Sequence, residues 1–149
     1  MNLLFLRNKM LKLKPNSASL LALAGFLLMA MGVYFIFLRP SLLPEDLRYM
    51  NITFPTLEDK IPNLQPWLQK VFWVLGGYIF TTGLLIIFIS QSAFKKRVNG
   101  VFVIVTIAGI SSIGLMTVVN FLIHSDFKWV LLLFTMPWAI SLILYHLKK

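Results

Sequence analysis

The stretch VFVIVTIAGISSIGLMTVVNFLI, residues 101–123, decides the fold class, because none of its 23 side chains is charged. A helix needs about 20 apolar residues to cross the hydrocarbon core of a bilayer. Three further apolar runs lie at 17–38, 67–94 and 127–147. The sequence therefore predicts an all-α integral membrane protein, whose single domain, residues 1–149, is a four-helix up-down bundle.

The composition of the whole chain agrees with this class. Hydrophobic residues make up 58% of the chain and charged residues 13%, whereas soluble domains have about 45–50% and roughly 25%. The first run is longer than the roughly 7–15 apolar residues of a signal peptide, so we expect an uncleaved first helix. Only the segment 39–66 is long enough to fold outside the membrane, as one long outer loop.

Charged residues divide between the two ends of the predicted helices. One side carries nine basic residues and no acid: Arg7, Lys9, Lys12, Lys14, Lys95, Lys96, Arg97, Lys148 and Lys149. The other side carries all five acids: Glu45, Asp46, Glu58, Asp59 and Asp126. Because basic loops stay in the cytoplasm, the pattern predicts that both termini are cytoplasmic. The net charge of +9 then reflects topology and contact with anionic lipids, and not nucleic-acid binding.

The outer loop contains five prolines, which exclude a long helix there. Two short helical segments are predicted, one at 45–50 after Pro44 and one at 57–60 with Thr56 as its N-cap. Both mix apolar and charged residues, so we expect them to lie along the outer interface.

Glycines repeat every seven residues in the first two helices. Gly25 and Gly32 lie in the first, and Gly76 and Gly83 in the second. If the helices run antiparallel, Gly32 meets Gly76 and Gly25 meets Gly83. Small residues allow membrane helices to approach closely, so we interpret this stripe as helix packing and not as a ligand groove.

The third and fourth helices each carry one stripe that we expect to face the bundle interior. Asn120 is the most polar residue of the third helix, and we expect its amide to hydrogen-bond across helices and so to support packing. The two stripes consist of Thr106, Gly109, Thr117 and Asn120, and of Phe134, Trp138, Ser141 and Tyr145.

Chemistry at membrane depth is sparse. Intramembrane ionisable residues mark ion pathways, and none lies near the middle of a predicted helix, which weighs against ion-coupled transport. His124 and His146 are predicted at opposite ends, so they cannot share a metal or haem. The absence of cysteine excludes thiol chemistry. We therefore predict no catalytic residue, no metal and no cofactor.

One group of charged residues remains as a candidate site at the outer interface: Arg39, Glu45, Asp46, Arg48, Asp126 and Lys128. One interpretation is an ion-pair network that fastens the loop across the helix ends. The other is a binding site for a lipid headgroup, a small molecule or a protein partner.

Three segments, at 39–50, 71–78 and 120–129, resemble uncharacterised small four-helix inner-membrane proteins of bacteria. The similarity extends over most of the chain, and the layout also looks like that of DoxX-type proteins. It implies a bacterial inner membrane, and that group has no known activity to transfer.

These observations lead to three hypotheses on function. The first is a non-enzymatic membrane protein, an accessory subunit or a scaffold that binds lipids, a protein partner or a second copy of itself. The second is a small membrane enzyme or carrier for a hydrophobic substrate at the outer interface. The third is an oligomeric channel or transporter. A polar cavity that reaches Asn120 favours the second and third, whereas a dry core favours the first.

Overall fold

The computed structural model describes residues 17–147, and within them every regular element is a helix. Four helices are long and apolar enough to cross a membrane. The first is α2 (Ser17–Phe37) and the fourth is α8 (Lys128–Leu147). The second and third contain π-helical turns. Their segments are α5 (Leu64–Ile89) and η1 (Ser90–Phe94), then α6 (Val101–Gly109), η2 (Ile110–Gly114) and α7 (Leu115–Leu122). The chain is thus an all-α protein with four candidate membrane spans.

The four helices begin and end within three residues of the predicted bounds. The largest difference is at α5, which begins at Leu64 and not at 67. Pro66 lies in its first turn, where its missing N–H needs no intrahelical partner, so the helix extends past the proline. The short helices of the loop, α3 (Pro44–Met50) and α4 (Phe54–Lys60), are also longer than predicted, because each has a proline in its first turn.

The N-cap prediction in the loop was wrong. Thr53, and not Thr56, precedes α4 as its N-cap, because Pro55 lies inside the first turn of the helix and does not end the preceding loop. The two threonine hydroxyls hydrogen-bond to each other at 2.8 Å.

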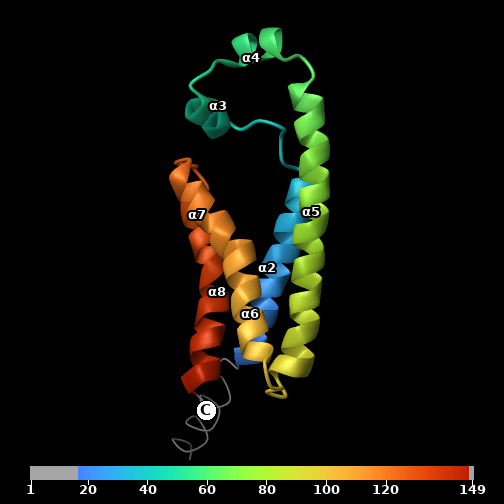
Figure 1. Ribbon diagram of the computed structural model, residues 1–149, viewed down its shortest axis with the longest axis vertical. Coiled ribbons are helices and arrows are strands. Elements are labelled where there is room, and N and C mark those ends of the chain that lie inside the picture. The colour runs from blue at the N-terminus through green and yellow to red at the C-terminus, as the bar shows by residue number, and fades with distance from the viewer. Residues whose placement is uncertain (1–16, 148–149) are drawn as a thin grey trace, which may run out of the picture.

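Successive spans run in opposite directions, so the bundle has two distinct ends (Figure 1). We call the end covered by α3 and α4 the loop end, and the end with Lys95, Lys96 and Arg97 the basic end. At the basic end the Ser141 hydroxyl donates to the Ser17 carbonyl at 2.7 Å, which joins α8 to the start of α2. The remaining basic residues of the predicted cytoplasmic side, at 7–14 and 148–149, lie outside the described residues.

The glycines of α2 and α5 face each other across the closest helix contact of the bundle. A Cβ atom built on Gly32 would lie 2.6 Å from the Phe80 nitrogen and 2.7 Å from the Gly76 oxygen. One built on Gly83 would lie 2.5 Å from the Gly25 oxygen. These distances leave no room for a side chain, so the two backbones touch directly. The pairs are those that the seven-residue spacing predicts.

The third span packs against α8 and not against α5. Figure 1 shows α6 beside the end of α5 and α7 inclined away from it, toward α8. The short connection between the second and third spans predicts that they are packed neighbours, and the structure confirms this only near their turn. A short turn sets the antiparallel direction, but it does not force two helices to stay in contact along their length.

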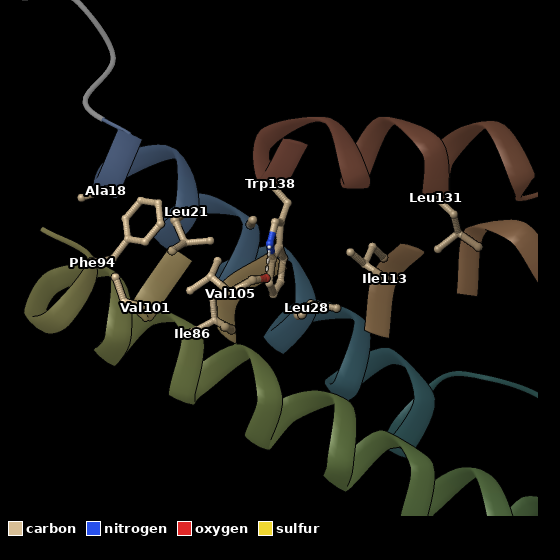
Figure 2. Close-up of a cluster of buried hydrophobic side chains, with 11 residues drawn as sticks. Ala18, Leu21, Leu28, Ile86, Phe94, Val101, Val105, Ile113, Leu131 and Trp138 are labelled. Carbon is tan, nitrogen blue, oxygen red and sulfur yellow. Dashed lines mark hydrogen bonds between the residues drawn. The ribbon is translucent and has the colours of Figure 1, made fainter. Parts of the chain in front are cut away.

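The core lies between all four spans, and most of it is toward the basic end (Figure 2). Trp138 of α8 is at its centre and is 2% exposed. Its indole N–H donates to the Val105 carbonyl at 3.1 Å. Gly109 leaves space for the ring, because an added Cβ would lie 2.5 Å from the indole nitrogen. Packing is therefore dense toward the basic end of the bundle.

Candidate functional site at the loop end

The predicted charged cluster divides into two ion pairs with very different surroundings. Arg39 lies 3.5 Å from Asp46, and their side chains are 10% and 22% exposed. Arg48 lies 2.9 Å from Asp126, and their side chains are 59% and 63% exposed. Lys128 takes part in neither pair. The structure thus separates a buried part of the cluster from an exposed part.

Arg39 follows α2 and is held against aromatic rings. Its guanidinium lies 3.5 Å from the centre of the Phe72 ring and 5.3 Å from that of Phe35. It also donates to the Pro40 carbonyl at 3.0 Å. Cation–π contacts of this kind are stronger when the cation is desolvated. Burial lowers the pKa of Arg39 below its ordinary value, and the charge of Asp46 acts in the opposite direction.

Asp46 stabilises the structure of the loop through two hydrogen bonds. Its Oδ2 accepts the Leu43 N–H at 2.9 Å as well as the Arg39 guanidinium. The first bond satisfies a backbone donor at the start of α3, where a carboxylate is also favoured by the helix dipole. Asp46 therefore attaches α3 to the end of α2 through Arg39.

Glu45 is the most buried charged residue of the cluster, at 2% exposed. Its Oε1 accepts the Ser125 hydroxyl at 3.0 Å, and the Ser125 oxygen accepts the Phe127 N–H at 3.1 Å. Within residues 17–147, no basic side chain forms an ion pair with Glu45, and its second oxygen accepts no hydrogen bond. The free oxygen keeps some accessible surface, because no side-chain oxygen of the described residues is both fully buried and without a hydrogen-bond partner.

These groups line one end of a cavity of about 470 Å³ between α2, α3, α7 and α8. Ligand sites in proteins are mostly apolar clefts of about 300–1,000 Å³ with a few polar groups. Here the polar groups are those of Tyr34, Arg39, Glu45, Asp46, Asn120 and Ser125. The rest of the wall is mainly apolar and includes Met31, Phe35, Val119, Val130 and Phe134. The cavity is therefore amphipathic, with its charged groups at the loop end.

Asn120 lies between this cavity and a second one of about 450 Å³ on the α5 side of α7. Phe35, Met116 and Val119 also line both. The expected hydrogen bond from Asn120 across helices is not found. Its amide donates to the Met116 carbonyl of its own helix at 2.9 Å, because the space beside it is cavity and not a neighbouring helix.

The hydrogen bond that joins α7 to α8 comes instead from two threonines. The hydroxyls of Thr117 and Thr135 lie 2.9 Å apart. The inward stripe predicted for the third helix thus contains an interhelical partner, but at Thr117 and not at Asn120.

Sequence reasoning missed the aromatic partners of Arg39 and the role of Ser125 beside Glu45. Phe35 precedes Arg39 by four residues, a spacing that places both on one helix face. Phe72 lies one turn from Gln69, which the glycine register places opposite Arg39, and the Gln69 amide indeed donates to the Arg39 carbonyl at 3.4 Å. Ser125 carried no such signal, because 80 residues separate it from Glu45.

The site offers binding groups and no organised catalytic set. Ser125 is engaged with Glu45 and with the turn before α8. Across residues 17–147, no three His, Asp or Glu side chains converge as metal ligands. The chain matches no known protein family, no curated protein and no solved structure. The resemblance to small bacterial four-helix proteins therefore stays a prediction, and function has to be inferred from the site.

Proposed function

We propose that this is a non-enzymatic membrane protein that binds a lipid in the cavity at the loop end. The observation that supports it is the amphipathic cavity of about 470 Å³, with Arg39, Glu45 and Asp46 at one end and an apolar wall beyond them. A lipid has the same division, with a charged headgroup above apolar chains. A polar, water-soluble ligand would have no apolar groups to place against the apolar wall of the cavity.

The location of the protein is part of the proposal. We infer a bacterial inner membrane in which the basic end faces the cytoplasm. The support is the sequence resemblance and the concentration of Lys95, Lys96 and Arg97, without any acid, at one end of the bundle. In this orientation the cavity lies at the level of the outer leaflet.

Filling the cavity tests the proposal. Val119 lines both cavities, so Val119→Trp places a large ring in the space where a lipid chain would lie. Val118 is the matched control, because it is the same residue on the same helix, 55% exposed, and lines neither cavity. We expect native mass spectrometry of purified protein to show a retained lipid in wild type and Val118→Trp, and its loss in Val119→Trp.

Lipid should also raise the melting temperature of the wild type in detergent, because a ligand that binds only the folded state stabilises it. Equal lipid retention and equal melting shifts in the two tryptophan variants would refute a site in this cavity. The remaining interpretation of the non-enzymatic role would then be an accessory subunit.

A carrier for a hydrophobic substrate is the second candidate, since a cavity does reach Asn120, but the wall of that cavity is mainly apolar and not polar. It is favoured by the polar Asn120 at the shared boundary of two cavities, which gives a substrate a second place to move to. Proteoliposomes with a fluorescent lipid in one leaflet distinguish the two roles. A carrier accelerates exchange between leaflets, and this acceleration is lost in Val119→Trp, whereas a binding protein leaves the exchange rate unchanged.

A further inference from the structure

The unpaired carboxylate of Glu45 specifies the headgroup more closely than the cavity alone does. Glu45 is 2% exposed and lines the cavity, and within residues 17–147 its one hydrogen bond comes from Ser125. Buried charges are normally paired, because desolvation is otherwise uncompensated. Among the described residues the charge of Glu45 acts on Arg39, but no basic group binds its carboxylate directly, so such a group is expected on the ligand.

The charges along the cavity wall also indicate a ligand with a positive group. Arg39, Asp46 and Glu45 together carry a net charge of −1, and among the described residues no basic group binds Glu45 directly. A headgroup with only negative charge would meet that carboxylate without compensation. A headgroup with a positive end would place a cation beside Glu45, while a phosphate on the same headgroup could share Arg39 with Asp46.

Arg39 adds a requirement for an anionic group. A guanidinium has five N–H donors, and those of Arg39 with partners in the described part of the chain go to the Pro40 carbonyl and, at 3.5 Å, to Asp46. The remaining donors belong to a side chain that also lines the cavity. Arginine binds phosphate well through such donors.

We propose that the lipid is a zwitterionic phospholipid whose primary ammonium binds Glu45 and whose phosphate binds Arg39, as in an ethanolamine phospholipid. A primary ammonium can donate hydrogen bonds to the free oxygen of Glu45, which a quaternary ammonium cannot. This inference rests on the proposed function, since it names the lipid for the same cavity.

A headgroup series with constant acyl chains tests the ligand class. Purified protein is titrated with ethanolamine, N-methylated ethanolamine, choline and glycerol phospholipids, and binding is read by native mass spectrometry and by the melting temperature. We expect the ethanolamine lipid to bind about tenfold more tightly than the glycerol lipid, from one charge-assisted hydrogen bond. Each added methyl group should weaken binding.

A matched pair of variants tests the role of Glu45. Glu45→Gln keeps the shape and removes the charge, whereas Glu58→Gln makes the same change on exposed α4, outside the cavity. We expect Glu45→Gln to bind the ethanolamine and glycerol lipids equally and, without lipid, to be at least as stable as wild type. Glu58→Gln should keep the wild-type preference.

The possible results separate the two proposals. If the glycerol lipid binds wild type as tightly as the ethanolamine lipid, and Val119→Trp still abolishes binding, the headgroup assignment is overturned and the lipid site stands. If no lipid in the series binds, both fail. Retention of the preference in Glu45→Gln also overturns the assignment. If Glu45→Gln does not fold, the headgroup series on wild type decides.

Discussion

Two adjacent glycines of α5 allow the α2–α5 contact to be tested with one methyl group. Gly76→Ala adds a Cβ that would lie 2.8 Å from the Gly32 oxygen and 2.7 Å from Cγ1 of Ile36. Ordinary contacts begin at 3.4 Å, so the methyl is about 0.6 Å too close to a backbone oxygen. Gly77→Ala adds the same methyl where no atom lies within 4 Å.

The comparison between these variants removes the effect of helix propensity. Both changes favour the helix by up to about 1 kcal/mol. Overpacking costs about 1–3 kcal/mol. It applies only to Gly76→Ala, because only this methyl meets the backbone of α2, and a backbone cannot rotate away as a side chain can. We therefore expect Gly76→Ala to be about 1–3 kcal/mol less stable than Gly77→Ala.

Equilibrium unfolding in mixed detergent–SDS micelles, with helicity as the readout, measures this difference. Gly32→Ala should lower stability in the same way, because its Cβ would lie 2.6 Å from the Phe80 nitrogen. Combined with Gly76→Ala, its effect should be less than additive, since both separate the same helices. If Gly76→Ala is as stable as Gly77→Ala, or more stable, the two helices are not in backbone contact and the reasoning is wrong.

Two further predictions concern the loop end and the topology. Arg48→Ala and Asp126→Ala should each cost at most about 1 kcal/mol, because the pair is exposed, and the double variant should cost less than the sum. Strict additivity in denaturation midpoints would show that the pair contributes nothing. A reporter fused after residue 149 should be active in the cytoplasm and one inserted at 50–63 outside it, as the charge division requires, and the reverse pattern would refute the proposed orientation.

Much of the fold was predictable because it depends on local or periodic properties. Apolar runs long enough to span a bilayer determine where the long helices lie, and the bounds differ by at most three residues. The difference at α5 arises because the helix begins at Leu64, two residues before Pro66, which lies in its first turn. The glycine register was also predictable, because two antiparallel helices with seven-residue repeats have few ways to bring their small residues together.

Part of the candidate site was predictable for the same reason. Charged residues in the loops on one side of a membrane lie at the same end of the bundle, so Arg39, Asp46, Arg48 and Asp126 could be grouped. Which of them pair, and which are buried, depends on how α3 folds back on the bundle. No sequence spacing encodes that.

What the sequence by itself determined is therefore the helical class of the protein, the alternating direction of successive spans and the register of α2 against α5, since hydrophobicity and small-residue period act along the chain. Only the tertiary structure decided that the third span packs against α8 and that cavities lie beside Asn120. It alone placed Glu45 against Ser125, 80 residues away. Contacts between distant segments depend on how whole helices pack, and the energy differences that select one packing are spread over many side chains.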